Sequence, residues 1–281
     1  MAAWWPGGDS TRHYCRFVAF SIVVGGSEGI GLAVAAQLAH RGDDVVICSR
    51  SRAKLDVALD ALAEQRRRDD QRLEARQIDV TDPHGTRETV DALVAEFGPP
   101  DLVVNTAGYA RPGWLSDLPA EDVQGMVDVN LRGTIHVARA VIPHLVEAGL
   151  GRFVATSSMA GLAGVFGYTV YSATKFGVLG FAEALRREVA PAGVGVHVLC
   201  PPNTLTPGFE TENRFKPAEV LAAEEKAQTM TADEVATELL RALGRSRPKP
   251  VIVPGRGNRL SAFAIRHLPF VVDRALRRPT P

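Results

Sequence analysis

Short runs of apolar and β-branched residues alternate along the chain with longer segments in which apolar positions recur every three or four residues. The first pattern is typical of buried strands and the second of amphipathic helices. The apolar runs predict strands at residues 17–24, 44–49, 74–79, 102–105, 151–157, 195–200 and 250–253. The periodic segments predict helices at residues 30–41, 52–68, 83–97, 120–147, 170–189 and 231–244, and Pro143 is expected to interrupt the fourth near its end.

This alternation is the sequence form of repeated strand–helix–strand units, which build a parallel sheet with helices on both faces. We therefore predict an α/β fold: a single Rossmann-type domain, doubly wound, with a parallel sheet of about seven strands. The domain is expected to span residues 17–255 of the 281-residue chain. Residues 1–16 are expected to form a disordered N-terminal extension, and residues 256–281 a basic amphipathic tail.

Composition excludes several classes of function. The formal net charge is zero, which argues against a nucleic-acid partner held by bulk charge. The three cysteines are far apart and the histidines lack metal-ligand spacing, so neither a metal site nor a disulfide framework is indicated. No run reaches the roughly 18 apolar residues of a membrane-spanning helix. These features favour a cytoplasmic protein.

A glycine-rich turn is expected between the first strand and the first helix. The stretch "VVGGSEGIG" places Gly25, Gly29 and Gly31 where a backbone can turn tightly and approach a pyrophosphate, and it includes Ser27 and Ile30. Free N–H groups at the start of the helix favour the same anion. The turn therefore predicts a dinucleotide site, although the carboxylate of Glu28 would oppose a nearby phosphate.

The end of the second strand, "CSRSR", indicates which dinucleotide is bound. Sites for NAD place an acidic side chain near this position, where it binds the ribose 2′-hydroxyl. Here Ser49 leaves room, and Arg50 offers a guanidinium to a 2′-phosphate, so NADP(H) is the expected cofactor. The alternative is that the arginines of this stretch are surface residues capping the next helix.

A tyrosine and a lysine are spaced by four positions in "YTVYSATKFG". On a helix, Tyr171 and Lys175 share a face, so the ammonium is expected to lower the pKa of the phenol, which is ordinarily about 10. That arrangement suits a general acid or base. The alternative is a tyrosine packed on the lysine stem of an ordinary helix. Tyr168 lacks a lysine four residues later.

Taken together, the glycine turn, "NTAG" at residues 105–108, "DVN" ending at Asn130, "SS" at residues 157–158 and "YSATK" at residues 171–175 resemble the short-chain dehydrogenase/reductase family. The resemblance covers about residues 17–253. It departs from the family pattern at Val24, which stands where Thr is usual, and in "NTAG", which replaces "NNAG". Both departures concern supporting hydrogen bonds.

The resemblance implies a role for each matching residue. Tyr171 would be the general acid/base, and Lys175 would lower its pKa and bind the nicotinamide ribose. Ser158 would stabilise the substrate carbonyl oxygen, since its spacing to the tyrosine favours it over Ser157, and Asn130 would complete a proton relay through water. The cofactor would also be lined by the residues after the third and fourth strands, namely Asp79, Val80, Asn105, Ala107 and Gly108.

The loop after the sixth strand, "CPPNTLTPGFETENRFKP", closely resembles that of the 3-ketodihydrosphingosine reductases, which reduce a long-chain sphingoid base with NADPH. By that resemblance Pro201, Thr204 and Thr206 would contact the cofactor, and residues 203–230 would form a lid over a lipid-like substrate. Three alternatives stay open: a generic lid, another hydrophobic alcohol or ketone such as a steroid or fatty acyl derivative, and a dinucleotide-binding regulatory protein without turnover.

The C-terminal tail combines apolar residues with many arginines. Between residues 245 and 281 there are eight Arg and one Lys against one acid, Asp273. This composition suits peripheral contact with an anionic membrane surface, but a subunit contact or a lid on the pocket is equally compatible. By resemblance, the chain is expected to form a homo-oligomer, a dimer or tetramer, through its fourth and fifth helices.

Overall fold

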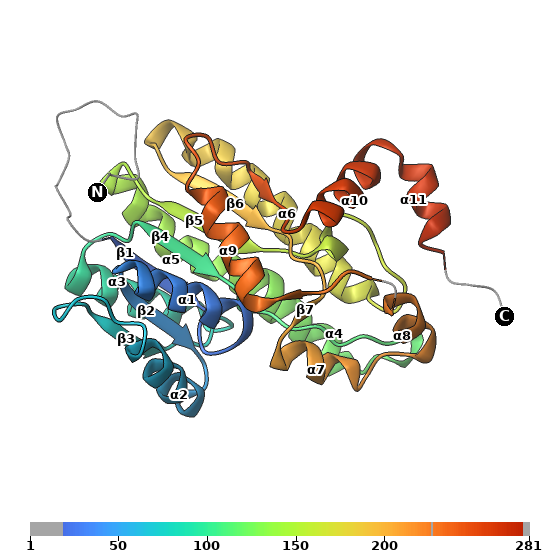
Figure 1. Ribbon diagram of the computed structural model, residues 1–281, viewed down its shortest axis with the longest axis horizontal. Coiled ribbons are helices and arrows are strands. Elements are labelled where there is room, and N and C mark those ends of the chain that lie inside the picture. The colour runs from blue at the N-terminus through green and yellow to red at the C-terminus, as the bar shows by residue number, and fades with distance from the viewer. Residues whose placement is uncertain (1–18, 226, 278–281) are drawn as a thin grey trace.

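The computed structural model describes residues 19–225 and 227–277. Within these residues, seven strands form one parallel sheet in the order β3-β2-β1-β4-β5-β6-β9. The chain adds strands outward from β1 to β3 and then returns to place β4 beside β1 (Figure 1). The predicted doubly wound parallel sheet is therefore confirmed, and the predicted extension at residues 1–16 lies outside the described residues. The strands are β1 Phe20–Val24, β2 Asp44–Ser49, β3 Leu73–Gln77, β4 Leu102–Asn105, β5 Arg152–Thr156, β6 Gly195–Leu199 and β9 Val251–Ile252.

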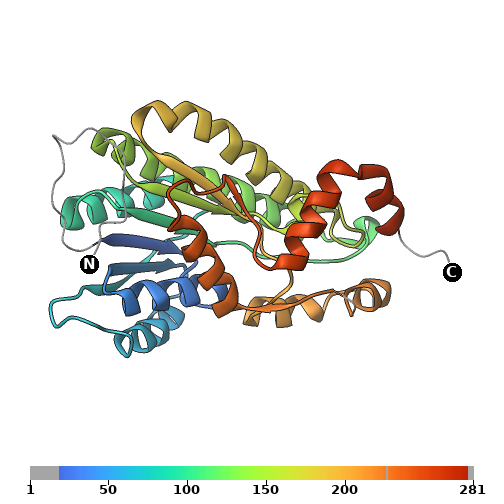
Figure 2. The same ribbon diagram turned by 45° about the horizontal axis from the view of Figure 1, so that its top comes forward.

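Helices cover both faces of the sheet, as Figure 2 shows. One face packs against α1 (Gly29–Arg41), α2 (Arg52–Ala63) and α9 (Ala232–Leu243), and the other against α3 (Pro83–Phe97), α5 (Gly133–Ala148) and α6 (Thr169–Val189). Because successive side chains of a strand point to opposite faces, Val23 joins the first core while Ile22 and Val24 join the second. Burial on both faces explains why the strands read as continuous apolar runs.

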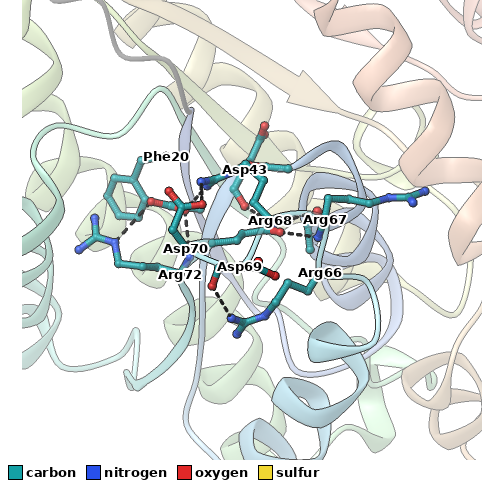
Figure 3. A network of polar contacts seen from close by, with 12 residues as sticks. Phe20, Asp43, Arg66, Arg67, Arg68, Asp69, Asp70 and Arg72 are labelled. Carbon is teal, nitrogen blue, oxygen red and sulfur yellow. Dashed lines mark hydrogen bonds and ion pairs between the residues drawn. The ribbon is translucent and has the colours of Figure 1, made fainter.

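The prediction for α2 was wrong at its C-terminal end, because the helix stops at Ala63 rather than at residue 68. The charged residues that follow form a connection to β3 that is tied to the rest of the sheet (Figure 3). Arg68 binds the carboxylate of Asp44 at 2.9 Å, and the buried amide of Gln71 donates to the Asp43 carbonyl at 2.7 Å. These tertiary hydrogen bonds outweigh the local helical preference of the segment.

The predicted fourth helix, at residues 120–147, is divided in the structure. The helix α4 (Ala120–Met126) leads into a π-helical segment, η2 (Val127–Arg132), and then into α5. Pro143 does not interrupt α5, which continues to Ala148, so that prediction was wrong. The irregularity lies upstream instead, where it carries Asn130, and π-helical turns of this kind occur frequently at functional sites.

Two parts of the chain, residues 204–231 and residues 256–275, form smaller elements at one end of the sheet. The short strands β7 (Thr204–Leu205) and β8 (Met230–Thr231) pair in parallel, and α7 (Pro207–Asn213) and α8 (Ala218–Glu224) lie between them in the chain. After β9, α10 (Arg256–His267) and α11 (Pro269–Ala275) extend from the same end (Figures 1 and 2). The 3₁₀ turns are η1 Leu115–Asp117, η3 Met159–Gly161 and η4 Ala190–Ala192. Of the helices described, none has the length and apolar character needed to cross a bilayer.

Candidate active site

The residues singled out from the sequence lie at the carboxyl ends of parallel strands. The glycine turn follows β1, Asn105 ends β4, Ser158 comes soon after β5, and Pro201 follows β6. In open α/β sheets, ligands bind outside these ends, where the strand order reverses. Here the order reverses between β1 and β4, so the glycine turn stands at that crevice.

The glycine turn has the backbone geometry that the sequence predicts. Gly25 and Gly29 have φ of 78° and 57°, which favour glycine, and a Cβ on Gly31 would lie 2.2 Å from the carbonyl oxygen of Gly25. The turn therefore brings the start of α1 so close to β1 that no residue larger than glycine fits at Gly31. The expected conflict at Glu28 is relieved, because its carboxylate binds Lys54 at 2.7 Å.

The loop after β6 reaches the same turn. A Cβ on Gly29 would lie 3.1 Å from the methyl carbon of Thr206, whose hydroxyl accepts a hydrogen bond from the Phe209 N–H at the start of α7. Thr204 is buried and donates to the carbonyl of Pro202, while the carbonyl of Pro201 accepts from Met159. Ser27 in the glycine turn and Ile30 at the start of α1 are half-buried.

Arg50, exposed at the end of β2, lies near the acidic residue that follows β3. Two hydrogen bonds from Thr81 lower the pKa of Asp79, and the Arg50 charge lowers it further. The neighbouring Val80 is buried, and its carbonyl contacts the His136 ring at 2.9 Å. Arg50, Asp79 and Val80 thus gather on the β2–β3 side of the glycine turn, as predicted for the adenosine half of a dinucleotide.

Hydrogen bonds of the Asn105 side chain hold the turn that follows β4. Asn105 donates from Nδ2 to Thr134 Oγ1 at 3.1 Å, and its Oδ1 accepts from the Ala107 N–H at 3.2 Å. A Cβ on Gly108 would lie 3.0 Å from Asn130 Oδ1 and 3.2 Å from Lys175 Nζ. Gly108 therefore lets the backbone pass directly over the predicted lysine.

Asn130, fully buried in η2, joins this turn to α6. Its Oδ1 accepts from the Tyr109 N–H and its Nδ2 donates to the Tyr109 carbonyl, both at 2.9 Å. The same amide donates to Thr174 Oγ1 at 3.1 Å, one residue before Lys175. The π-helical turn thus places an amide where it positions both segments.

The structure brings Ser158, and not Ser157, to Tyr171. The Ser158 hydroxyl lies close enough to the Tyr171 phenol to lower its pKa, and Ser158 Oγ accepts from the Ala160 N–H at 3.1 Å. Ser157 is buried and donates to the carbonyl of Lys175 at 2.8 Å, which directs it into the helix backbone. The spacing argument for Ser158 therefore agrees with the geometry.

Lys175 lies beside the tyrosine, but the direction expected for the phenol pKa was wrong in the protein alone. Lys175 Nζ is 5.6 Å from the centre of the Tyr171 ring and donates to the Thr156 carbonyl at 2.9 Å. Burial lowers the pKa of Lys175 to about 8. Burial, and then the charge of Glu212, raises the pKa of Tyr171 above its usual value, and the Ser158 hydroxyl opposes this. Desolvation of the phenolate outweighs the attraction of one ammonium.

A charged cluster on the other side of Tyr171 did not emerge from the sequence. Tyr168 Oη lies 2.5 Å from a carboxylate oxygen of Glu212 and 2.8 Å from one of Glu224, and its single proton can serve either. The ammonium of Lys216, whose side chain is 0% exposed, lies 3.3 Å from Glu212 and 2.5 Å from Glu224. These four residues, the lid cluster, join α7 and α8 to the start of α6. The spacing of Glu212 and Lys216 by four residues was the available signal.

The site as a whole fits a dinucleotide and a carbonyl compound. The glycine turn is packed so tightly that a Cβ on Gly25 or Gly31 would collide with neighbouring protein atoms, and the free N–H groups at the start of α1 suit a pyrophosphate. The phenol of Tyr171, the hydroxyl of Ser158 and the ammonium of Lys175 converge beyond it, and they can donate protons to an oxygen. No group of three or more potential metal ligands occurs among the residues that the structure describes.

Comparison with known proteins gives one family and a set of similar enzymes. A family described as short chain dehydrogenase matches residues 19–217. The chain is 36% identical to 3-ketodihydrosphingosine reductase of Bos taurus over 221 residues, which are 78% of this chain and 67% of that protein. It is 35% identical to 3-dehydrosphinganine reductase of Danio rerio, over 76% of this chain and 65% of that protein.

A solved structure supports the same fold. The short-chain dehydrogenase from Sphingobium yanoikuyae in complex with NADPH superposes with a TM-score of 0.75 and is 25% identical in sequence. The match covers 94% of this chain and 98% of that protein.

The lid cluster generates a prediction about the lid. Replacing Lys216 with Met leaves Glu212 and Glu224 buried without their cation, and breaking a buried ion pair in this way costs about 3–5 kcal/mol. We expect amide hydrogen exchange in α7 and α8 to accelerate by about 100-fold or more, measured by mass spectrometry. The control is K216M combined with E212Q and E224Q, which removes all three charges and should restore most of the protection. Unchanged exchange in K216M alone would contradict a role of the ammonium in holding the lid.

Proposed function

Because the chain belongs to the short chain dehydrogenase family, we propose that it reduces the 3-keto group of 3-ketodihydrosphingosine to the alcohol with NADPH. The observation that carries the proposal is the convergence of Ser158, Tyr171 and Lys175 beyond the glycine turn. The substrate rests on the similarity to the two vertebrate reductases.

Arg50 is proposed to determine the preference for NADPH over NADH. Its guanidinium is exposed at the end of β2, and Ser49 beside it carries no charge that would repel a 2′-phosphate. The pyrophosphate would lie on the glycine turn and the N-terminus of α1, between Ser27, Ile30 and Thr206, and the adenine beside Asp79 and Val80. Asn105, Ala107, Gly108, Pro201 and Thr204 would line the nicotinamide half of the site.

In this proposal Tyr171 supplies the proton and Lys175 supplies the positive charge. NADPH, when bound, supplies the hydride to the carbonyl carbon. Tyr171 donates its proton to the carbonyl oxygen, and a raised pKa keeps that proton on the phenol at neutral pH, which suits reduction. Ser158 donates to the same oxygen as charge develops on it. Lys175 binds the nicotinamide ribose, and Asn130 completes a water relay that returns a proton to the site.

Residues 203–230 are proposed to act as the substrate lid. They contain α7 and α8, which the lid cluster holds against Tyr168, three residues before Tyr171. Opening of this lid would admit an amphiphilic substrate, and closure would exclude water from the carbonyl.

The C-terminal helices are proposed to contact a membrane surface at the periphery. Leu260, Phe263 and Phe270 are exposed at 70%, 59% and 89%, and arginines lie between them in the sequence. Such a surface suits the interface of an anionic bilayer, where a sphingoid substrate would reside. We also propose a homo-oligomer formed through α5 and α6, where Phe176 is exposed.

Turnover of 3-ketosphinganine by the purified chain tests the proposed function. We expect oxidation of NADPH, followed at 340 nm, with sphinganine as the product by mass spectrometry. We expect NADH to be a poorer cofactor and the preference for NADPH to fall at least tenfold in Arg50→Ala, since the charge-assisted bond to the 2′-phosphate is lost.

Two outcomes would contradict the proposal. Consumption of NADPH with ketosteroids or 3-oxoacyl derivatives, without reduction of 3-ketosphinganine, would assign a different hydrophobic ketone. Absence of turnover with all of these substrates, despite measurable NADPH binding, would favour a regulatory protein.

The phenol of Tyr171 gives a second prediction. Tyr171→Phe removes the proton donor while keeping the ring, so we expect kcat to fall by about 10²–10⁴ with NADPH binding retained, measured by stopped-flow and by fluorescence titration. The matched control is Tyr168→Phe, which removes a hydroxyl 2.5 Å from Glu212 and should lower kcat less than tenfold. Equal losses in both variants would assign the effect to packing.

Vesicle flotation tests the membrane contact. We expect the unaltered chain to float with vesicles containing phosphatidylserine and to be released by salt, because the attraction between arginines and lipid is screened. Replacing Leu260, Phe263 and Phe270 together with Glu should abolish flotation, while Glu in place of Val57, an exposed residue of α2, should not. Identical flotation of all three proteins would exclude this surface.

A further inference from the structure

The segment that joins Ser158 to Tyr171 forms a wall between two parts of the molecule. Directly after the 3₁₀ turn η3, Leu162 and Ala163 lead to Phe166. On one side the segment touches the lid, since a Cβ on Gly167 would lie 2.4 Å from the Val220 side chain of α8. The same residues that follow the catalytic serine therefore also contact the lid.

The other side of this wall opens into a cavity of about 430 Å³ shared with α10 and α11. Residues 162–164 and Phe166 line it from the wall, and Ile265, Val272 and Leu276 line it from the C-terminal helices. Its volume lies within the range of roughly 300–1,000 Å³ that is usual for sites of small molecules. We call this cavity the C-terminal groove.

The lining of the C-terminal groove suits a hydrocarbon. Its charged lining residues, Asp273 and Arg277, bind each other at 2.8 Å, so their charges are paired at the edge of the groove. The wall is held in place, because Phe166 stacks on Trp114 with a centroid distance of 6.3 Å and the Gly167 carbonyl accepts from the Gly113 N–H. A polar ligand would find few partners here, whereas an alkyl chain needs none.

We propose that the C-terminal groove binds the alkyl chain of the substrate whose keto group lies at Ser158 and Tyr171. This inference rests on the proposed function, and it adds a binding site for a long saturated chain. Leu162, which lines the groove, is four residues after Ser158, so the two residues lie at most about 14 Å apart, a distance that a long alkyl chain can span. The groove also lies beside the apolar surface of α10 and α11, from which a lipid would enter.

Chain-length dependence in variants of Ile265 tests this proposal. Each methylene removed from water can improve binding by roughly fourfold, so a long chain should bind far better than a short one. In Ile265→Glu we expect KM to rise at least tenfold when 3-ketosphinganine is the substrate, and to change less than twofold when the substrate is a six-carbon 2-amino-3-keto alcohol. Ile265→Trp, which keeps the groove apolar but narrows it, should shift the preferred substrate toward shorter chains.

The control is Ser261→Glu, which adds the same charge at an exposed position of α10 and should leave KM unchanged for both substrates. Equal changes for long and short substrates in Ile265→Glu, or no shift of chain preference in Ile265→Trp, would overturn the proposal. Circular dichroism of each variant identifies loss of fold. If Ile265→Glu does not fold, the chain-length preference of Ile265→Trp decides whether the proposal holds.

A binding measurement separates failure of the groove from failure of the proposed function. If the unaltered chain reduces neither substrate, the proposed function fails, and titration calorimetry with sphinganine then decides on the groove. Binding of sphinganine that weakens at least tenfold in Ile265→Glu, and not in Ser261→Glu, supports a chain-binding groove. Binding that is absent or equal in all three proteins overturns it.

Discussion

One buried ammonium constrains the centre of this molecule. The side chain of Lys175 is almost wholly out of water, and a buried cation requires fixed partners. The Thr156 carbonyl accepts a hydrogen bond from the ammonium, Gly108 leaves the space that the ammonium needs, and the Ser157 hydroxyl donates to the Lys175 carbonyl. Asn130 holds the preceding residue of the helix. The ammonium therefore fixes how four segments meet, namely β5, the turn after β4, η2 and α6. Because Tyr171 lies on α6, its position is fixed by the same contacts.

Local sequence patterns predict much of the fold and of the candidate site. The doubly wound parallel sheet follows from the alternation of apolar runs with helical periodicity, and the glycine turn follows from steric needs that act within a few residues. The interval from Tyr171 to Lys175 lies within α6, so helical periodicity alone predicts that these side chains share a face. Three features depended on contacts distant in sequence and escaped prediction. These are the early end of α2, which Arg68 and Gln71 enforce, the π-helical turn at Asn130, and the lid cluster.

The pKa of Tyr171 shows why charge patterns alone misjudge a site. Spacing indicates that an ammonium is near the phenol, but it does not indicate how much water both groups lose. Burial lowers the pKa of Lys175 to about 8, so the cation itself is weakened, while burial and Glu212 act together against the phenolate. In the proposed reduction this balance is useful, because Tyr171 in its acid form would donate the proton. A cationic nicotinamide ring, present after hydride transfer, would favour the phenolate left behind.

Lys175 and Lys216 are two buried lysines with different partners. Lys175 faces a neutral carbonyl and stays available to a ligand, whereas Lys216 faces two carboxylates and is satisfied within the protein. The first arrangement costs stability and suits a site that a bound group completes. The second joins α7 and α8 to the start of α6. Because the segment between Ser158 and Tyr171 contacts α8 on one side and lines the C-terminal groove, closure of the proposed lid and binding of an alkyl chain would act on the same segment.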